Sequence, residues 1–217
     1  MNGDGRADIV GRKVNDINPA NFTADDIEVG LSTSVYFEVS KQWASWDPTF
    51  DYQLGDMDGD GRADIVGRRD DQIQVGLSSG QGFLAPTVWT KWDIAFDYAL
   101  ADVDDDGRAD LGLSGEEVRV ALSTGNGFAA SAVWANWDTR FDHHFADMNG
   151  DGRADLIGRA GEDIEVALST GNGFAAPMTW AQWPSAVSYQ IADVNGDGPA
   201  DLIGLDSSSF WVGLAVH

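Results

Sequence analysis

Hydrophobic and polar residues alternate in five short stretches of the chain. In one of them Ile73, Val75 and Leu77 are separated by single polar or small residues. A period of two is typical of a β-strand that buries one face. The same register recurs at Ile27/Val29/Leu31, Val118/Val120/Leu122, Ile164/Val166/Leu168 and Phe210/Val212/Leu214. We therefore predict five equivalent strands, each with one buried face, and no window shows helical periodicity.

Each of these strands belongs to a repeating unit of about 46 residues. The aspartates that close the shared motif, Asp8, Asp64, Asp110, Asp155 and Asp201, are 56, 46, 45 and 46 residues apart, and the longer first interval contains the polar stretch VNDINPANFTADD. A unit offers four predicted strands, exemplified by YALADV, ADIVGR, QIQVGLS and GFLAPTVWTKW. Turns such as SSGQG and STGNG separate the last two strands of a unit.

Four short antiparallel strands in 40 to 50 residues, repeated without helices, predict the blade of a β-propeller. We expect an all-β fold in a single propeller domain over residues 1–217, with repeats at about 1–50, 51–96, 97–141, 142–187 and a partial one at 188–217. The first and last units contain too few strands for complete blades. The chain is expected to close as four to five blades, to belong to a larger ring, or to pair with another chain through exposed strand edges.

An acidic loop lies at the same place in every unit. In DMDGDGRAD, residues 56–64, carboxylates occupy loop positions 1, 3, 5 and 9, glycine occupies position 6, and the carbonyl of Arg62 is available at position 7. This is the spacing by which a short loop wraps a calcium ion in EF-hands, although position 12 is Gly67 and the flanks are predicted strands. The alternative is a tight Asp-Gly turn with a solvated negative face. Recurrence in all five units favours calcium, held as a structural ion.

The predicted calcium ligands follow this spacing in each copy, and the first copy lacks a residue for position 1. They are Asn2, Asp4 and Asp8; Asp56, Asp58, Asp60, Arg62 and Asp64; Asp102, Asp104, Asp106, Arg108 and Asp110; Asp147, Asn149, Asp151, Arg153 and Asp155; and Asp193, Asn195, Asp197, Pro199 and Asp201.

Charge and composition narrow the function classes. The 217 residues carry 36 Asp plus Glu against 13 Lys plus Arg, a formal net charge of -23, which argues against nucleic acid as a partner because phosphate binding requires basic surfaces. No stretch is apolar enough to span a membrane. The sequence opens on MNGDGRAD, without a signal peptide, so we expect any export signal to lie upstream. Loops of this type often bind calcium at the millimolar levels found outside cells, which favours an extracellular location.

The loop and strand motifs together carry a family resemblance. The pattern F-x-x-A-D-V-N-G-D-G-x-x-D-L-I-G, followed by V-A-L-S-x-G-x-G-F, resembles the FG-GAP/VCBS repeats, which also form the propeller heads of integrin α-chains. Within that family the chain is most similar to the PVL-type lectins of fungi and bacteria, seven-bladed propellers that bind N-acetylglucosamine-type sugars. The resemblance covers essentially the whole chain and implies a calcium-stabilised propeller. The same repeats occur in adhesins and toxin components, so the fold does not by itself fix the function.

Pairs of tryptophans end the first four units: Trp43/Trp46, Trp89/Trp92, Trp134/Trp137 and Trp180/Trp183. Residues three apart in a regular strand face opposite sides, so we expect one member of each pair in the core and the other at the handover to the next blade. An indole face beside a carboxylate suits the C–H face and hydroxyls of a sugar. The predicted sugar contacts are Trp46, Asp47, Trp92, Asp93, Trp137 and Asp138, and the alternative is that all the tryptophans pack between blades.

No motif in the chain indicates catalysis. The segment GLSSG at 76–80 matches G-x-S-x-G, but the equivalent segments read ALSTG and lack the strand–turn–helix context of a nucleophile. The histidines are His143, His144 and His217, too few for a histidine triad or metal site. We expect a calcium-stabilised, multivalent carbohydrate-binding protein without enzymatic activity. The rival hypothesis is a protein-interaction or self-assembling propeller that binds no sugar.

Overall fold

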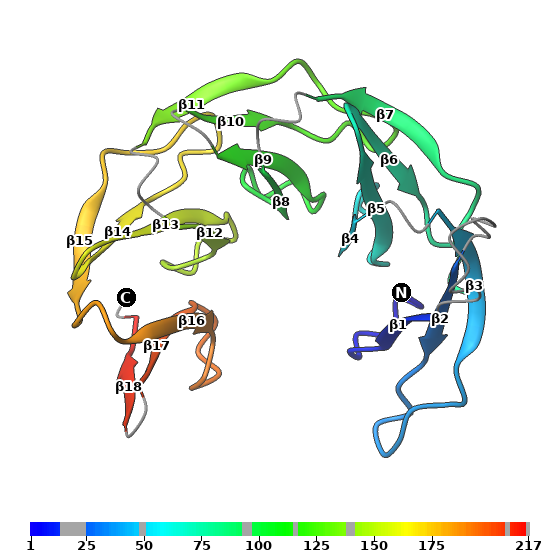
Figure 1. Cartoon of the computed structure of the whole chain (residues 1–217), viewed down its shortest axis with the longest axis horizontal. Helices are drawn as coiled ribbons and strands as arrows, with labels where there is room; N and C mark the ends of the chain where they lie inside the picture. The colour runs from blue at the N-terminus through cyan, green and yellow to red at the C-terminus, as the bar shows by residue number, and fades with distance from the viewer. Residues whose placement is uncertain are drawn as a thin grey trace, which may run out of the picture. The chain divides into compact units, whose positions relative to one another are not determined.

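The computed structural model describes residues 1–13, 25–47, 51–92, 97–114, 117–137, 142–206 and 209–215, and every regular element within these ranges is a β-strand (Figure 1). No helix in this part of the chain is long and apolar enough to cross a membrane. The strands form five antiparallel sheets in which each strand pairs with its neighbours in sequence. One sheet falls within each predicted repeat. The all-β fold class and the blade-like sheets of three to four strands are thereby confirmed.

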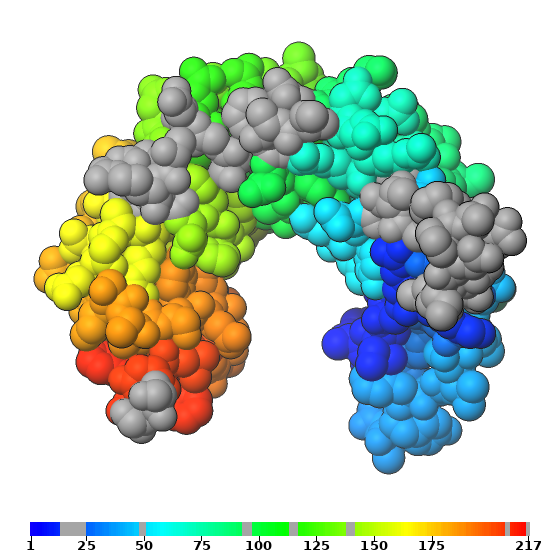
Figure 2. Space-filling view, viewed as in Figure 1, coloured from blue at the N-terminus to red at the C-terminus, as the bar shows by residue number. Residues whose placement is uncertain are grey.

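The chain divides into two compact units. The first unit contains two sheets, β1 (Ile9–Lys13), β2 (Asp25–Gly30) and β3 (Lys41–Trp46), and β4 (Asp51–Gly55), β5 (Asp64–Arg69), β6 (Gln72–Gly76) and β7 (Thr87–Lys91). It also includes the loop tip Gly107–Ala109 and the turn Ser123–Phe128. Residues 31–40, which join β2 to β3, extend beyond the strands of their own sheet (Figures 1 and 2, light blue).

The second unit contains the other three sheets. They are β8 (Asp97–Ala101), β9 (Asp110–Ser114), β10 (Glu117–Ala121) and β11 (Ala132–Asn136); β12 (Asp142–Ala146), β13 (Asp155–Ala160), β14 (Asp163–Ala167) and β15 (Met178–Gln182); and β16 (Ser188–Ala192), β17 (Asp201–Leu205) and β18 (Phe210–Gly213).

The third strand of a complete sheet is the centre of its core, as the alternation predicts. Ile73 and Val75 of β6 are 0% and 1% exposed, and Ile164 and Val166 of β14 are both fully buried. Where the next sheet belongs to the same compact unit, side chains of this kind pack against its second strand. Ile164 and Val166, for example, share a cluster with Leu202 of β17. The period-two pattern therefore buries the face that joins one repeat to the next.

The last repeat departs from this prediction. Phe210 and Val212 are equivalent in register to the buried Ile164 and Val166 of β14, yet they are 81% and 56% exposed. Leu214, which follows β18, is 54% exposed. Strand β18 pairs with β17 only, whereas β14 pairs on both sides, with β13 and β15. The expectation of a buried face is therefore wrong for β18, because among the described residues no fourth strand or following sheet covers it.

The predicted fourth strands are shorter than the sequence pattern implied. The segment GFLAPTVWTKW is a strand only over β7, Thr87–Lys91. Phe83 forms an isolated bridge with Ser78 instead, which closes the turn after β6. Pro86, which has no amide hydrogen to donate to a ladder, lies directly before the strand.

The four strands that carry the tryptophan pairs each contain a β-bulge that the sequence does not reveal. In β3 the partner of Ile27 is Ala44 and the partner of Glu28 is Gln42, so Trp43 is the extra residue between them. The first tryptophan of the other three pairs occupies the same bulge: Trp89, Trp134 and Trp180. A bulge shifts the alternation of faces by one residue. The expectation that two tryptophans three apart cannot both be buried is therefore wrong for Trp43 and Trp46, which are 7% and 3% exposed.

Candidate functional site

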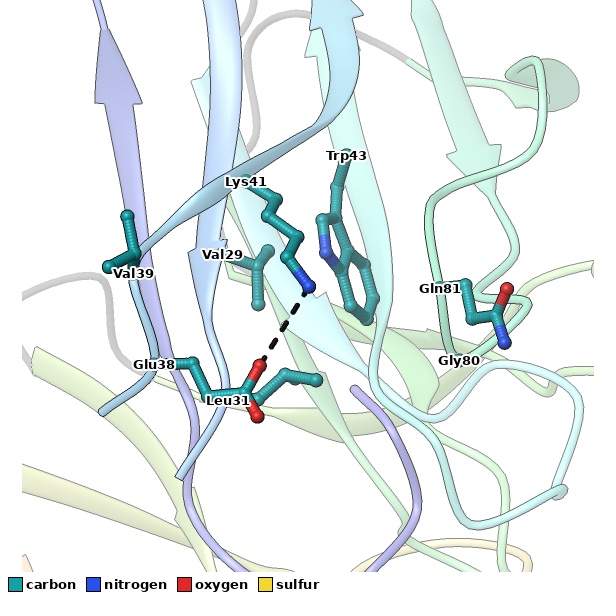
Figure 3. A pocket seen from close by; sticks show the side chains of 8 residues that line it. All are labelled: Val29, Leu31, Glu38, Val39, Lys41, Trp43, Gly80 and Gln81. Carbon is teal, nitrogen blue, oxygen red and sulfur yellow. Dashed lines mark ion pairs between the residues drawn. The ribbon is translucent and has the colours of Figure 1, made fainter. Parts of the chain in front are cut away.

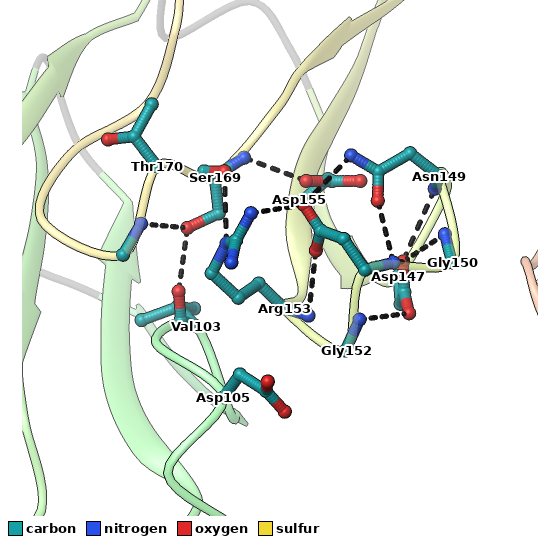
Figure 4. Close-up of polar contacts among 12 residues, drawn as sticks. Val103, Asp105, Asp147, Asn149, Gly150, Gly152, Arg153, Asp155, Ser169 and Thr170 are labelled. Carbon is teal, nitrogen blue, oxygen red and sulfur yellow. Dashed lines mark hydrogen bonds and ion pairs between the residues drawn. The ribbon is translucent and has the colours of Figure 1, made fainter.

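The first aspartate of each complete acidic loop organises the backbone of that loop. In the fourth repeat the carboxylate of Asp147 accepts hydrogen bonds from the backbone amides of Gly150 at 2.7 Å, Gly152 at 2.9 Å and Asp151 at 3.2 Å (Figure 4). Gly150 and Gly152 have φ values of 78° and 86°, in the region that favours glycine. The glycines of the motif are therefore required by the turn that wraps the chain around Asp147.

The last aspartate of the loop is buried and connects two turns. Asp155 is 0% exposed, and its two carboxylate oxygens accept hydrogen bonds from the backbone amides of Met148 at 3.0 Å and Ser169 at 2.7 Å. Asp64 makes the equivalent bonds with the amides of Met57 and Ser78. Burial raises the pKa of Asp64 and the pKa of Asp155 to about 6, against the opposing effect of these amide bonds.

The middle of the loop holds charged groups close together. Asp151 accepts a hydrogen bond from the Asn149 side-chain amide at 3.1 Å and forms an ion pair with Arg153 (Figure 4). Asp60 pairs with Arg62 in the same way in the second repeat. Desolvation, followed by repulsion from Asp60, raises the pKa of Asp58. The loop therefore brings negative charge into a small volume where a cation would relieve the repulsion.

Two of the loops bring three carboxylates close enough together to bind one metal ion. The oxygens of Asp56, Asp58 and Asp64 all lie within 4.8 Å of each other, and so do those of Asp102, Asp104 and Asp106. These are hard oxygen donors, the ligand type that calcium prefers. The donor set thus fits a calcium ion by its chemistry. The carbonyl oxygens predicted at loop position 7, on Arg62, Arg108, Arg153 and Pro199, stay predictions.

The terminal copies of the loop keep part of this arrangement. In the first copy Asp4 is bonded to the Asn2 side chain at 3.0 Å, and Asp8 accepts from the Ser32 amide at 2.9 Å. In the fifth copy Asp193 accepts from the Gly196 amide at 2.7 Å, and this bond contributes most to lowering the pKa of Asp193. Asp201 is fully buried and accepts from the Ala215 amide at 2.8 Å. The fold of the loop is therefore retained at both ends.

The first four acidic loops are also bonded to the repeat that follows them. Between the third and fourth repeats, the Ser169 hydroxyl donates to the Val103 carbonyl at 2.6 Å (Figure 4). The Ala154 amide donates to the Asp102 carbonyl at 2.7 Å. Between the second and third repeats, the Ser123 hydroxyl donates to the Met57 carbonyl at 2.7 Å. A change in the conformation of one loop would therefore alter the hydrogen bonds that join it to the next repeat.

The predicted sugar contacts are placed differently from one another. Trp46 and Trp137 are 3% and 5% exposed and pack in hydrophobic clusters, whereas Trp92 is half-buried. Asp47 forms an ion pair with Arg69 at 2.7 Å. Asp93 and Asp138 lie outside the described residues. Packing of the indole rings in the core favours a structural role for Trp46 and Trp137.

The first tryptophan of three pairs joins adjacent repeats. The rings of Trp43 and Phe83 meet edge to face at 5.4 Å, and the Phe83 amide donates to the Trp43 carbonyl at 3.0 Å. Trp89 with Phe128 and Trp134 with Phe174 repeat this contact at 5.5 and 5.4 Å. The phenylalanine of the G-F motif is thus the partner of the bulge tryptophan from the preceding repeat.

A cavity of about 340 Å³ lies at the joint between the first two sheets, and the sequence analysis did not identify it. Its apolar wall includes Val29, Leu31, Val39 and Trp43 (Figure 3). Glu38, Lys41 and the turn residues Gly80 and Gln81 supply the polar groups. A comparison of the repeats with one another would have given a signal, because Glu38 and Lys41 are charged where the later repeats carry uncharged residues.

A search for known families found an FG-GAP-like repeat over residues 147–204. This stretch contains the fourth acidic loop, from Asp147 to Asp155, together with strands β13 to β16 and all but the last residue of β17. The predicted resemblance to FG-GAP repeats is thereby confirmed. A comparison with curated proteins found no match.

Solved structures with similar folds include a lectin from Agrocybe aegerita, described as recognising non-reducing terminal N-acetylglucosamine. The two share 23% sequence identity with a TM-score of 0.79, over 99% of this chain and 60% of the lectin chain. The Tc holotoxin pore of Photorhabdus luminescens matches at 21% identity with a TM-score of 0.67, over 99% of this chain and 11% of the other. At these identities the likeness shows the fold, and the chain spans about 60% of the length of the lectin.

Proposed function

We propose, from the FG-GAP-like repeat and the lectin-like fold, that this chain is a calcium-stabilised propeller that binds carbohydrate outside the cell. The observation that carries the proposal is the likeness of nearly the whole chain to the Agrocybe aegerita lectin. That lectin is described as recognising terminal N-acetylglucosamine, and we propose sugars of this type as the ligands here. The proposal includes no catalytic step.

Calcium is proposed as a structural ion. The loop carboxylates of the second and third repeats are the best-supported ligands, because their oxygens already lie close together. The hydrogen bonds that join the second and third loops to the next repeat give the ion a means of stabilising the joints. A cation bound in the loop would remove the repulsion among carboxylates and hold the turn in the conformation that makes these bonds.

Repetition suits multivalent binding. Sites that recur between repeats would convert weak binding of single sugars into avidity for a glycan surface. Of the tryptophans predicted to contact sugar, Trp92 is the best placed, because its ring is only half-buried while Trp46 and Trp137 are packed in the core.

The Trp92→Ala variant tests this assignment. We expect it to lose most of its retention on immobilised N-acetylglucosamine while its far-ultraviolet circular dichroism stays that of the parent protein. The matched control is Trp211→Ala, which removes an indole that is 36% exposed at the edge of the last sheet. Equal retention of both variants would contradict a sugar contact at Trp92.

A protein-interaction or self-assembling propeller is the second candidate, and one observation favours it. Phe210 and Val212 on β18 are 81% and 56% exposed, and Val35 and Val39 before β3 are 89% and 87% exposed. Strand β18 also has an unpaired edge among the described residues, which can template pairing with another chain. Light scattering over a range of protein concentrations tests this candidate. Growth of the mass with concentration supports association, and a constant monomer mass contradicts it.

A further inference from the structure

The joint between the first two repeats differs chemically from the later joints. In the first four repeats the residue at the Glu38 position donates its backbone amide to the carbonyl of the leucine equivalent to Leu31, and the residue at the Lys41 position pairs with a buried valine. These two positions hold Leu84 and Thr87, Ala129 and Ala132, and Ala175 and Met178 in the second, third and fourth repeats. A charged pair is thus present at the first joint and absent from the same positions in the later repeats.

We propose that the cavity at this joint, the first-joint pocket, binds a single neutral pyranose residue of a glycan, with its C–H face on the apolar wall and its hydroxyls on Lys41, Glu38 and Gln81. This inference rests on the proposed carbohydrate-binding function and gives it a location. The cavity volume of about 340 Å³ lies at the lower end of the range of roughly 300–1,000 Å³ found for ligand pockets. The pocket therefore suits one sugar ring rather than several.

Two residues of the apolar wall, Trp43 and Val29, are held in place before any ligand arrives. Trp43 is 7% exposed, its ring meets Phe83 edge to face, and its carbonyl accepts the Phe83 amide at 3.0 Å. Val29 is 1% exposed and belongs to the core strand β2. A wall that does not rearrange loses little entropy on binding, which favours recognition of a small ligand.

The polar side of the pocket offers both donors and acceptors. The Lys41 ammonium lies 3.8 Å from the Glu38 carboxylate, and the two side chains are 74% and 47% exposed (Figure 3). An exposed pair at this distance is weak, so both groups retain hydrogen-bonding capacity for a ligand. Their charges cancel, which favours a neutral ligand over a sugar acid or an amino sugar with a free ammonium.

A tight turn presents Gln81 from the second sheet. The Ser79 amide and hydroxyl both donate to the Gly82 carbonyl, at 2.9 and 2.7 Å, and Gly80 has a φ of 78°. The turn is further fixed by the bond from the Gly80 amide to the Ser78 hydroxyl at 3.1 Å. The Gln81 amide, which can donate and accept, is therefore positioned by a defined backbone at the rim of the pocket.

The test uses the full chain and the methyl glycoside of N-acetylglucosamine as the probe, measured by isothermal titration calorimetry in millimolar calcium. The double variant Lys41→Thr/Gln81→Ala removes polar groups of the pocket, and threonine is the residue of the second repeat at that position. The control is Lys91→Thr/Gln182→Ala, which makes the same chemical changes at exposed sites on β7 and β15.

We expect the pocket variant to lose one probe-binding site per chain or to bind at least tenfold more weakly, while the control titrates like the parent protein. Unchanged binding by the pocket variant would overturn the first-joint pocket and leave the proposed carbohydrate binding intact. A parent protein that binds neither this probe nor any glycan on an array would overturn both. Thermal unfolding of each variant shows whether it is folded, and the single variant Gln81→Ala on the exposed turn replaces any double variant that is not.

Discussion

At the residue scale, the fold strongly raises the pKa of the last aspartate in the second and fourth loops. Asp64 and Asp155 are fully buried, and burial raises their pKa values to about 6. These folded-state pKa values lie above the usual value, so protonation of the two carboxyls favours the folded, metal-free protein. This stabilisation is fully present below about pH 4. That stabilisation is lost as the pH rises through about 6. A bound calcium ion would reverse this preference, because it favours the ionised carboxylate.

Calcium binding is therefore expected to depend on pH and to release protons near pH 6. Calcium must displace a proton from Asp64 or Asp155, so we expect the affinity to be about tenfold weaker at pH 5 than at pH 7 for a loop that contains one such carboxyl. Titration calorimetry at pH 6 in buffers of different ionisation enthalpy measures the protons released. Equal affinities at both pH values, with no proton release, would contradict this account of the loop.

The bulge tryptophans give a second prediction at this scale. Trp134 packs edge to face against Phe174 of the next repeat at 5.4 Å, so its replacement removes a contact that joins two sheets. We expect Trp134→Ala to lower the free energy of unfolding by about 3 kcal/mol. Tyr36→Ala, at a site that is 67% exposed, is the control and should change it by less than about 0.5 kcal/mol. Similar losses for both variants would show that the Trp134–Phe174 contact does not hold the joint.

At the element scale, a serine that follows the third strand links neighbouring repeats in the second, third and fourth repeats: Ser78, Ser123 and Ser169. The Ser169 hydroxyl donates to the Val103 carbonyl at 2.6 Å and accepts from the Gly171 amide at 3.2 Å, and Ser169 is 3% exposed. The equivalent serine of the second repeat, Ser78, is the serine of GLSSG, which matches G-x-S-x-G, and its hydroxyl donates to the Met1 carbonyl at 2.8 Å. Its bonds explain the motif as a structural joint.

We expect Ser169→Ala to destabilise the protein by about 1–3 kcal/mol, because it leaves the buried Val103 carbonyl without this donor. Ser45→Ala, on the exposed face of β3, should stay within about 0.5 kcal/mol of the parent protein. Denaturant unfolding in calcium-containing buffer measures both. No difference between the two variants would count against the serine as a joint between repeats.

The strands were predictable from sequence because each repeat supplies its own alternation. Ile73 and Ile164 are buried as that pattern implies. The pattern failed at the β-bulge of Trp43, where one strand has an extra residue that its partner strand does not match. It also failed at Val212, which was predicted to be buried but has no strand or sheet packed on it among the described residues. Neither failure can be read from one strand alone, because each depends on pairing with a neighbour.

The candidate sites were predictable to different degrees for the same reason. The calcium loop is local, so its ligand spacing in Asp56 to Asp64 is visible in the sequence. The first-joint pocket combines Lys41 with Gln81 from another repeat, and it appears only when two sheets are brought together. The predicted sugar contact at Trp46 could not be judged from sequence. Trp46 is 3% exposed because neighbouring strands and sheets pack around it, and that packing is not visible in the sequence.

At the scale of the whole molecule, a net charge of -23 opposes folding in the absence of cations. We expect calcium to raise the melting temperature and chelation to lower it, since each site that binds only the folded state adds about 2.7 kcal/mol when calcium is at a hundred times its Kd. Sodium chloride at matched ionic strength is the control for charge screening. Equal melting temperatures in calcium and in chelator would contradict a structural role for the ion.

The central claim is that the repeats form a carbohydrate-binding propeller, and a glycan array probed with labelled, folded protein in millimolar calcium tests it most directly. We predict saturable binding to a related set of glycans that end in N-acetylglucosamine-type residues, and loss of that binding when calcium is chelated. A blank array with folded, calcium-loaded protein would contradict the claim and would leave the tryptophans as packing between repeats.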